Sequence, residues 1–483
     1  MPIDLHRSAT DLATAVRAGD VSPVDLVEAS LDRIEALNDR TNAFVNVLHE
    51  AARERAAAAE RAVDAGEDLG ALHGVPVAIK DLSYTKAGVP NTAGIAALED
   101  NVAAETSVAV QRLEDAGAIV VGTTNTPELG HTPRTYNELQ GPTGTPFDPE
   151  RNAGGSSGGS AAALGEGLVP LATGSDVGGS LRTPASCCGV ASVKPTHGLI
   201  PREARPNAFG SHTPFGVLGP MARWVEDLGL LLEVMAGRDD RDPFSVPKPD
   251  RYDDVSPADP EGLRLAHSPT LETFAVDEAV REVVADALGT VEDAGATVDP
   301  AELDGPDRGD LTYAYGVAAT VHFAVVADAV QHEHGLDFTG DDADDVSDTF
   351  VQTLAMGRGY DATTYRETDE VRTALYDAVE SALSGYDALV CPTLATPTLS
   401  HDEPFPTEID GQNVSGLPMD WMLSWVFNMT GHPVVNVPAG LVDGLPVGMQ
   451  LVGPRYSESR LLDVAALFER ENPWAGAYPR VES

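Results

Sequence analysis

Two short runs of glycine and serine lie close together in the chain: Asn-Ala-Gly-Gly-Ser-Ser-Gly-Gly-Ser at residues 152–160 and Gly-Ser-Asp-Val-Gly-Gly-Ser-Leu-Arg at residues 174–182. Glycine adopts backbone conformations that are closed to other residues, and it lets a second group approach the main chain closely. Two such runs, each containing serines, predict backbone N–H groups gathered around two hydroxyls. Preorganised N–H donors of this kind stabilise a developing oxyanion.

A run rich in glycine and serine is also typical of a flexible linker. Here the residues between the two runs, 161–172, are largely apolar, and residues 185–193 are apolar again. A linker does not alternate with apolar sequence in this way. We therefore interpret both runs as loops of a folded core.

Net charge is the unusual property of the composition. The 483 residues include 76 Asp and Glu against 31 Lys and Arg, a formal net charge of -45, and the acidic residues are spread along the whole chain. This pattern argues against nucleic acid as a direct ligand. It is typical of adaptation to high intracellular salt, because 1 M salt screens repulsion to a range of about 3 Å.

Lysine and cysteine are both scarce. A protein that has almost no lysine is expected to keep each one for a specific role, and the lysines here are Lys80, Lys86, Lys194 and Lys248. Three cysteines cannot all pair with one another; they are Cys187, Cys188 and Cys391, in apolar surroundings. We expect buried free thiols and a cytoplasmic protein. This expectation agrees with the N-terminus, which lacks a signal-peptide pattern, and with the absence of an uninterrupted apolar run long enough to span a bilayer.

Helices and strands are expected to alternate along much of the chain. Ser22-Pro23 predicts a helix start, because serine is a preferred N-cap and proline suits the first helical position. Further helices are expected at residues 51–65, 106–116, 225–236, 278–288 and 458–469, and strands at 74–79, 118–121, 263–266, 296–298, 388–391, 434–437 and 447–452. Residues 237–262 are expected to form a surface excursion, and residues 301–385 to be mostly helical. The alternation predicts an α/β protein.

Several short motifs have more ordinary interpretations. Residues 155–159 fit the Gly-x-Ser-x-Gly nucleophile elbow, but that elbow follows a hydrophobic strand, and residues 147–153 are polar and turn-like. The acidic run 341–345 lacks the glycine and the final glutamate of a calcium loop, so a solvated loop is expected and no metal site. His-Glu-His at 332–334 is expected at the surface. Ser-x-x-Lys at 83–86 has no Lys-Thr-Gly partner.

Three residues remain as candidates for chemistry: Lys80 at the end of a predicted strand, Ser156 in the first run and Ser180 in the second. On these residues the chain resembles the amidase signature family, whose catalytic set is Ser–cis-Ser–Lys. The matching stretches are residues 74–81, 154–160, 174–182 and 189–196, with further matches at 219–220, 428–440 and 444–453. The resemblance extends from about residue 20 to the end, and it is thin between about 240 and 400.

The resemblance implies an α/β fold, the amidase signature fold, with a mixed central β-sheet flanked by α-helices on both faces. It implies one domain over residues 1–483, with N-terminal helices at about 1–70. The catalytic core is expected at about 71–235 and 386–483, and a variable segment that determines substrate preference at about 237–385.

The resemblance also assigns roles to residues. It makes Ser180 the nucleophile, Ser156 a bridging serine in a cis peptide after Gly155, and Lys80 the base. It implies an oxyanion hole made by the backbone N–H groups of Val177, Gly178, Gly179 and Ser180. A lysine acts as a base when burial lowers its pKa from the ordinary value of ~10.4. Asp176 and Arg182 are expected to brace this loop, Cys187 and Cys188 to pack, and no cofactor is implied.

The function implied is hydrolysis of a small-molecule amide to a carboxylate and ammonia or an amine, through an acyl-enzyme on Ser180. No nucleic acid or membrane partner is expected, and a homodimer is left open. The alternative is the glutaminase subunit of a tRNA-dependent amidotransferase; residues 353–357 and 427–431 look more like stand-alone amidases. A catalytically silent scaffold is the third alternative, against which all three catalytic positions are intact. Four aromatic side chains either line an acyl pocket or belong to the core: Tyr136, Trp421, Trp425 and Phe427.

Overall fold

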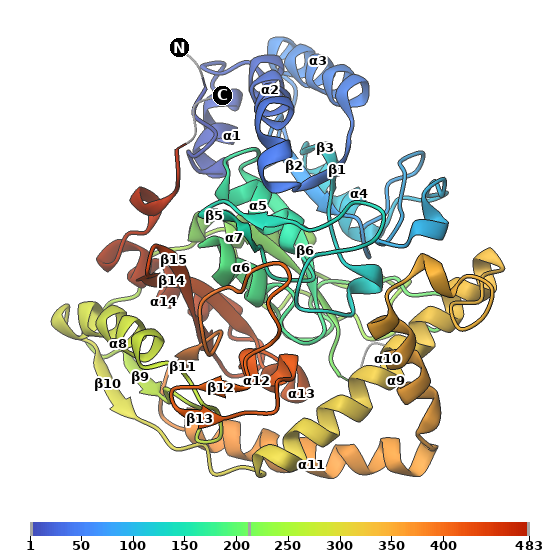
Figure 1. The fold of residues 1–483 in the computed structure, drawn as a ribbon. Coiled ribbons are helices and arrows are strands. Elements are labelled where there is room, and N and C mark those ends of the chain that lie inside the picture. The colour runs from blue at the N-terminus through green and yellow to red at the C-terminus, as the bar shows by residue number, and fades with distance from the viewer. Residues whose placement is uncertain (1–2, 211–213, 481–483) are drawn as a thin grey trace.

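The computed structural model describes residues 3–210 and 214–480, and in these residues an eleven-stranded sheet runs through the molecule (Figure 1). The strand order is β1-β3-β2-β6-β8-β7-β14-β15-β11-β9-β10. In chain order the strands are β1 (Phe44–Val47), β2 (Pro76–Lys80), β3 (Ile119–Thr124), β6 (Leu171–Asp176), β7 (Ala191–Lys194), β8 (Val217–Ala222), β9 (Arg264–His267), β10 (Thr297–Pro300), β11 (Ala388–Pro392), β14 (Val434–Val442) and β15 (Leu445–Val452).

The sheet is mixed, as the family resemblance implied. Strand β2 runs parallel to both of its neighbours, β3 and β6, and β9 runs parallel to β10 and β11. The other neighbouring pairs are antiparallel. Two small ribbons lie outside the sheet: β4 (Gly144–Thr145) with β5 (Asp148–Asn152), and β12 (Glu408–Ile409) with β13 (Gln412–Asn413).

Helices flank the sheet. They are α1 (Ala9–Arg17), α2 (Pro23–Thr41), α3 (His49–Ala65), α4 (Val108–Asp115), α5 (Gly158–Gly165), α6 (Arg182–Cys188), α7 (Val225–Met235), α8 (Glu278–Asp293), α9 (Arg308–His334), α10 (Asp348–Gly359), α11 (Ala362–Leu383), α12 (Pro418–Trp421), α13 (Val426–Thr430) and α14 (Glu458–Glu471). Helices α5 and α6 contact each other and the central strands, whereas α14 contacts both α7 and α8 in a second layer. The predicted α/β fold with a mixed sheet and flanking helices is confirmed.

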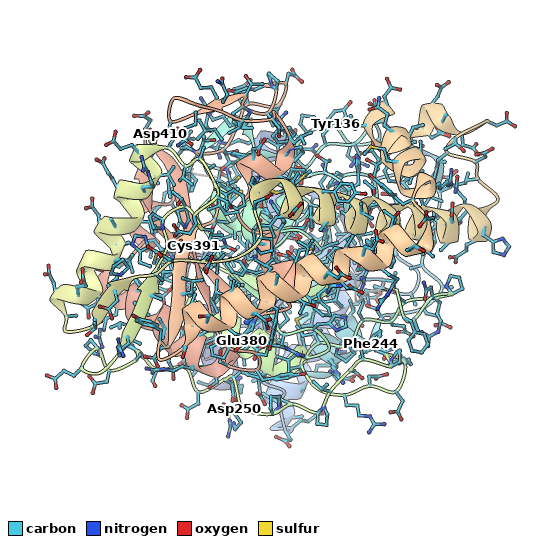
Figure 2. The ribbon with its side chains drawn as sticks, turned by 90° about the horizontal axis from the view of Figure 1, so that it is seen from below. Tyr136, Phe244, Asp250, Glu380, Cys391 and Asp410 are labelled. Carbon is cyan, nitrogen blue, oxygen red and sulfur yellow. The ribbon has the colours of Figure 1, made fainter. Side chains whose placement is uncertain are left out.

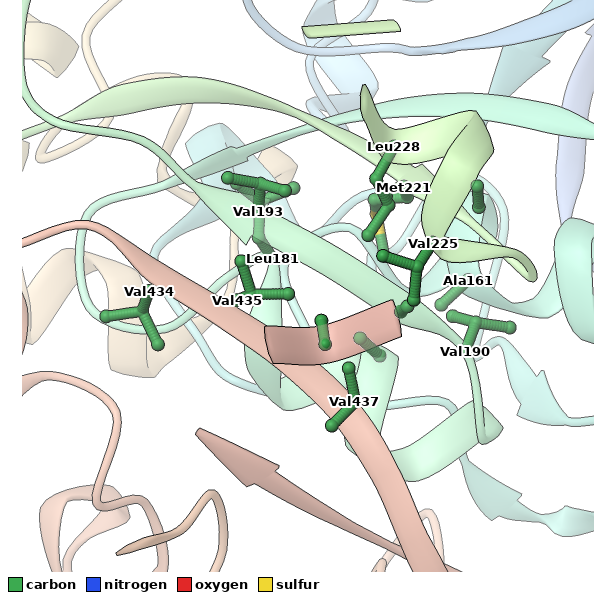
Figure 3. Close-up of a cluster of buried hydrophobic side chains, with 14 of the residues drawn as sticks. Ala161, Leu181, Val190, Val193, Met221, Val225, Leu228, Val434, Val435 and Val437 are labelled. Carbon is green, nitrogen blue, oxygen red and sulfur yellow. The ribbon is translucent and has the colours of Figure 1, made fainter. Parts of the chain in front are cut away.

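Apolar side chains from both the sheet and the helices fill the core. Figure 3 shows Leu181 in one cluster with Val193 of β7, Met221 of β8, Val225 of α7 and Val435 of β14. All five are fully buried. Burying apolar surface in this way is the main favourable contribution to folding, and here it fixes the loop that precedes α6 against the sheet.

Most of the predicted elements are present within a few residues of their expected bounds. Ser22 caps α2, because its hydroxyl accepts from the backbone N–H groups of Val24 and Asp25. One interpretation was wrong: residues 148–152 form strand β5 instead of a turn. Its partner β4 supplies the hydrogen bonds that a polar sequence of this kind does not signal. Residues 237–262 contain no helix or strand among the described residues, in agreement with a surface excursion.

The segment 301–385 consists mainly of three long helices, as predicted. Helix α9 is 27 residues long, and by length and composition alone it is apolar enough to cross a membrane. In this structure it packs against α10 and α11, and Figure 2 shows α11 lying along it. The acidic run near Asp341 contains a short 3₁₀ turn, Ala343–Asp345, with no buried residue. The proposed division of the chain into a core and a variable segment stays a prediction.

Candidate active site

The sheet places Lys80 at the centre of the molecule. Lys80 is the last residue of β2, and β2 pairs in parallel with β6 through Val77 opposite Leu171. Because parallel neighbours end at the same edge of a sheet, Lys80 lies beside the end of β6 and the loop that follows it. The Lys80 N–H donates to Thr173 Oγ1 at 3.2 Å, and the side chain is fully buried.

The side-chain nitrogen of Lys80, Nζ, has two hydroxyl partners. Nζ lies 2.6 Å from Ser156 Oγ and 3.1 Å from Ser175 Oγ. Burial lowers the pKa of Lys80 to about 7, while the carboxylate of Asp176 raises it and the guanidinium of Arg202 lowers it further. A lysine with such a pKa is substantially neutral near pH 7, which is the state that a general base requires.

Ser156 lies two residues before α5, in the first glycine- and serine-rich run. The bond between Gly155 and Ser156 is a cis peptide, as the resemblance implied. A Cβ on Gly155 would lie 2.8 Å from the main chain of Thr132, Pro133 and Arg134, so no side chain fits there. The two runs are joined directly, because the Ser157 N–H donates to the Ser180 carbonyl at 3.2 Å.

Ser157 itself has a structural environment. Its hydroxyl is fully buried, donates to the Ser175 carbonyl at 3.4 Å and accepts from the Ser175 N–H at 3.3 Å. These contacts tie the first run to β6 and leave the hydroxyl engaged with the main chain. The geometry agrees with the interpretation of the elbow motif at residues 155–159 as accidental.

The loop that carries Ser180 is held by Asp176. One carboxylate oxygen accepts from the Gly179 N–H at 2.8 Å, and the other accepts from the Leu181 N–H at 3.1 Å. Burial alone would raise the pKa of Asp176, but the guanidinium of Arg182 beside it lowers that pKa to about 2. Asp176 is therefore ionised, and it fixes the backbone on both sides of Ser180.

Arg182 completes the support of this loop. Its Nε and Nη2 form a fork on the Asp176 carboxylate, at 3.1 and 3.0 Å. The remaining donors reach the Ser424 carbonyl at 2.7 Å, Asn428 Oδ1 at 2.7 Å and Gln450 Oε1 at 2.8 Å. A buried ion pair with its donors satisfied is a rigid brace, which is the role expected for these two residues.

Four backbone N–H groups were predicted to form the oxyanion hole, and they differ in their partners. The Gly179 N–H is engaged with Asp176. The amides of Val177, Gly178 and Ser180 donate no hydrogen bond to any residue in the described part of the chain. Ser180 is half-buried, while Lys80 and Ser156 are buried, so of the three candidate residues it is the most accessible to a ligand.

Helix α9 packs against the loop that carries Ser180, through its residue Tyr315. A Cβ on Gly178 would lie 1.8 Å from Tyr315 Oη, and a Cβ on Gly179 would lie 1.9 Å from Ser424 Oγ. Gly179 also has a φ of +117°, so this position requires glycine. At Gly178 a side chain would have to displace the Tyr315 hydroxyl. The Tyr315 ring stacks on Trp425 with a centroid distance of 4.9 Å, so a residue of the predicted variable segment closes over the predicted catalytic loop.

The four aromatic residues left between pocket and core have separate positions. Trp421, Trp425 and Phe427 are almost completely buried, and Trp425 supports Tyr315. Tyr136 is 40% exposed and donates to Glu138 at 2.9 Å; Figure 2 shows it at the edge of the molecule. The three buried residues belong to the core. Trp425 also supports the Tyr315 ring, which packs against the loop.

The other candidates from the sequence lie away from this site. Lys86 pairs with Glu114 at 2.7 Å, and the histidines at 332 and 334 are exposed. Cys187, Cys188 and Cys391 are buried free thiols, and burial raises the pKa of Cys187 to about 12. Within residues 3–210 and 214–480, no group of three or more histidine, cysteine or acidic side chains has an arrangement that would hold a metal ion.

Sequence reasoning missed four residues near the site. Ser175 lies inside a motif that was identified, but its contact with Lys80 was not foreseen. Lys194 was flagged only by the scarcity of lysine; it is fully buried, Nζ donates to the Pro195 carbonyl at 3.3 Å, and burial lowers its pKa to about 7. Tyr315 and Arg202 had no signal in the sequence, because only the packing of distant segments brings them here.

The fold and this geometry agree with the comparisons. The Amidase family matches residues 25–462, so the chain belongs to the amidase family. It is similar to an acylamidase of Rhodococcus erythropolis, at 36% identity over 98% of this chain and 97% of the relative. It is also similar to the A subunit of the glutamyl-tRNA(Gln) amidotransferase of Carboxydothermus hydrogenoformans, at 34% identity over 99% of each chain.

Among solved structures, a bacterial aryl acylamidase of the amidase signature family superposes with a TM-score of 0.93. It is 31% identical, and the match covers 98% of this chain and 97% of that one. The protein is an enzyme, an amidase that hydrolyses the C–N bond of a carboxylic amide.

Proposed function

We propose that this amidase works through Ser180 as nucleophile, Ser156 as proton relay and Lys80 as base. One observation carries the proposal: the fully buried Lys80 Nζ lies 2.6 Å from Ser156 Oγ. Burial also lowers the pKa of Lys80 to about 7. A serine hydroxyl becomes an effective nucleophile only when a neighbouring base takes its proton, and this pair supplies such a base.

The first half of the reaction forms an ester. Ser180 Oγ attacks the amide carbon while its proton passes to Ser156 Oγ, which gives its own proton to neutral Lys80. The tetrahedral intermediate then collapses: the C–N bond breaks, and Ser156 hands a proton to the leaving nitrogen as Lys80 returns one to Ser156. Ammonia or an amine departs, and the acyl group stays on Ser180.

The second half repeats the sequence with water as the nucleophile. Water loses a proton through Ser156 to Lys80 and attacks the ester carbon. The ester C–O bond then breaks, and Lys80 returns the proton through Ser156 to Ser180 Oγ. The carboxylic acid releases its remaining proton to solvent, which gives the carboxylate and the free enzyme. In both halves a negative charge develops on the former carbonyl oxygen, and the amides of Val177, Gly178 and Ser180 are the donors available to receive it.

The fourth predicted donor has a different role in this proposal. The Gly179 N–H donates to Asp176 Oδ1 at 2.8 Å. That bond fixes the peptide planes on either side, so that neighbouring N–H groups keep one direction without reorganising during the reaction. We infer that Gly179 holds the loop in shape while the other three amides contact the oxyanion.

We favour an amidase that acts alone over the glutaminase component of a complex. An acylamidase at 36% identity and an amidotransferase component at 34% are both relatives, so identity alone does not separate the alternatives. Residues 353–357 and 427–431 are closer to stand-alone amidases in their pattern. The TM-score of 0.93 to an aryl acylamidase supports the same choice.

A substrate panel separates these alternatives. Primary aliphatic amides, aryl amides, anilides and glutamine are incubated with the isolated protein in molar KCl, and released ammonia or amine is measured. We expect hydrolysis of amides other than glutamine, and none by Ser180→Ala. Activity on glutamine alone would favour the amidotransferase component; no activity on any amide would favour the silent scaffold.

We further propose that the enzyme works in the cytoplasm of a cell with high internal salt. The three buried free thiols suit a reducing compartment. The net charge of -45 suits a medium in which repulsion is screened.

A further inference from the structure

Arg202 lies in the segment that leads from β7 to β8, and its backbone is fixed. The Arg202 N–H donates to Asp242 Oδ2 at 2.9 Å. The same carboxylate accepts from the Phe244 N–H at 2.8 Å, and Asp242 is 6% exposed. Because a buried carboxylate holds this backbone, the Arg202 side chain starts from a defined position.

The guanidinium of Arg202 reaches the edge of the loop that carries Ser180. A Cβ on Gly216 would lie 2.6 Å from Arg202 Nη1 and 3.4 Å from Val177 Cγ2, so the guanidinium sits against Gly216, close to Val177. Its charge is felt on two sides of the site. It adds to burial in lowering the pKa of Lys80, and it does the same for His322 of α9.

In the part of the chain that the structure describes, the Arg202 side chain forms no hydrogen bond and no ion pair. The contrast with Arg182 is clear, since every donor group of that side chain is engaged. Arg202 is half-buried, and its guanidinium nitrogens are not among the fully buried donors that lack a partner. They are therefore accessible to an anionic ligand, which would accept their hydrogen bonds.

Arg202 lines a cavity of about 460 Å³ together with one face of α9. That face is aliphatic and consists of Val321, Val325, Val326, Ala329 and Val330. Ser83, three residues after Lys80, also lines the cavity. A volume of this size suits a small organic ligand, and the wall suits a hydrocarbon chain.

The other ionisable groups that line the cavity are neutral, engaged with other groups or exposed, so Arg202 is the main cation available to bind an anionic ligand there. Burial and the charge of Arg202 lower the pKa of His322 to about 3, so this imidazole is neutral. The Arg205 guanidinium donates to the carbonyls of Ala204 and Arg241, at 2.7 and 3.0 Å. Glu203 pairs with Arg241 at 3.7 Å, and Glu333 is exposed.

We propose that this cavity is a substrate subsite that selects amides carrying a carboxylate, which Arg202 binds while the aliphatic face of α9 packs against the chain between the carboxylate and the amide. A planar guanidinium binds a carboxylate through two parallel hydrogen bonds. The proposal rests on the proposed active site, because the amide must lie at Ser180 while the carboxylate lies at Arg202.

The test compares pairs of probes that differ only in the carboxylate. Adipamate and hexanamide place it on the acyl side, whereas N-acetyl-γ-aminobutyrate and N-butylacetamide place it on the amine side. We measure kcat/KM for each with the wild type, Arg202→Met and the control Arg251→Met, in molar KCl. For each pair we take the ratio of kcat/KM for the carboxylate probe to kcat/KM for the neutral probe. In one of the two pairs, acyl-side or amine-side, we expect Arg202→Met to lower this ratio by about 10- to 100-fold, mainly through KM.

The control variant should change that ratio by less than about threefold, because Arg251 pairs with Asp253 at 2.9 Å and lies outside the lining of the cavity. Equal losses of kcat/KM for the carboxylate probe and the neutral probe would overturn the proposal. Such losses are expected if Arg202 acts only through the pKa of Lys80, because that effect is the same for both probes and cancels in the ratio. An unchanged ratio in both pairs would overturn it as well.

A binding measurement separates failure of this proposal from failure of the proposed catalytic function. Calorimetric titration of adipamate and of N-acetyl-γ-aminobutyrate needs no turnover, so it applies even if neither amide is hydrolysed. Binding that is lost in Arg202→Met and kept in Arg251→Met supports the subsite. Equal binding by both variants contradicts it.

Discussion

At the scale of the residue, the protonation of Lys80 decides the chemistry. The protein carries a net charge of -45, and a negative field would hold a lysine protonated. Two local effects act against that field: burial, which is the larger, and the guanidinium of Arg202. Repulsion and attraction at long range are screened in molar salt, so the immediate surroundings determine the pKa.

The pH dependence of hydrolysis follows from this pKa. The protonated lysine is inactive as a base, and the neutral form predominates above a pKa of about 7. We therefore expect kcat/KM to rise with pH through about 7 and to level off above it. A pH–rate profile in molar KCl measures this. A profile that is flat between about pH 5.5 and 8.5, or one that falls as pH rises through 7, would contradict the assignment.

Substitution of Lys80 separates a base from an electrostatic brace. A guanidinium keeps its charge at all working pH values, so Lys80→Arg should lower kcat/KM nearly as much as Lys80→Ala, by about 100- to 10,000-fold. Lys86→Arg is the matched control, because Lys86 only pairs with Glu114. An Lys80→Arg enzyme with most of its activity would mean that another group is the base.

At the scale of the element, the loop between β6 and α6 depends on one buried ion pair. Arg182→Met would leave the Asp176 carboxylate buried beside fewer donors, and we expect the free energy of unfolding to fall by about 3–5 kcal/mol. The surface pair of Arg241 and Asp239, at 2.9 Å, provides the control: Arg241→Met should cost less than about 1 kcal/mol.

Denaturant unfolding in molar KCl, followed by circular dichroism, measures both variants. Since the loop carries Ser180, we also expect Arg182→Met to lose activity before it unfolds. Equal shifts of the unfolding midpoint for the two variants would show that the buried pair stabilises the structure no more than a surface pair does.

Most elements could be predicted because their sequence patterns are local. The apolar run that ends at Lys80 predicts β2 and also places the lysine at its end, and Ser22-Pro23 predicts the start of α2. Strand β5 could not be predicted, because its sequence is polar and its hydrogen bonds come from β4. Local propensity is overridden there by pairing with a neighbour.

The site was predictable to the extent that motifs contain it. Ser156, Ser180 and Lys80 stand in recognisable stretches, and the structure shows the contact between Lys80 and Ser156. Tyr315 and Arg202 reach the same region from α9 and from the segment before β8. Their position near the site depends on how elements that are distant in the sequence pack together, and no local sequence pattern predicts that packing.

At the scale of the whole molecule, charge and salt are linked. Acidic side chains lie around the periphery, as Asp250 and Asp410 illustrate in Figure 2. Unscreened repulsion among them opposes the compact state. We expect the thermal midpoint to rise by several degrees between 0.1 and 2 M KCl, with the largest gain at the low end. Scanning calorimetry measures it, and equal midpoints in dilute and molar salt would contradict salt adaptation.

The central claim is that an acyl group forms on Ser180, and trapping that ester tests it most directly. The enzyme is mixed with a slowly hydrolysed aryl ester or anilide, quenched in acid and digested, and the modified peptide is sequenced by mass spectrometry. We predict an adduct on Ser180 in the wild type and none in Ser180→Ala. An adduct on Ser156 or Ser157 instead would contradict the account.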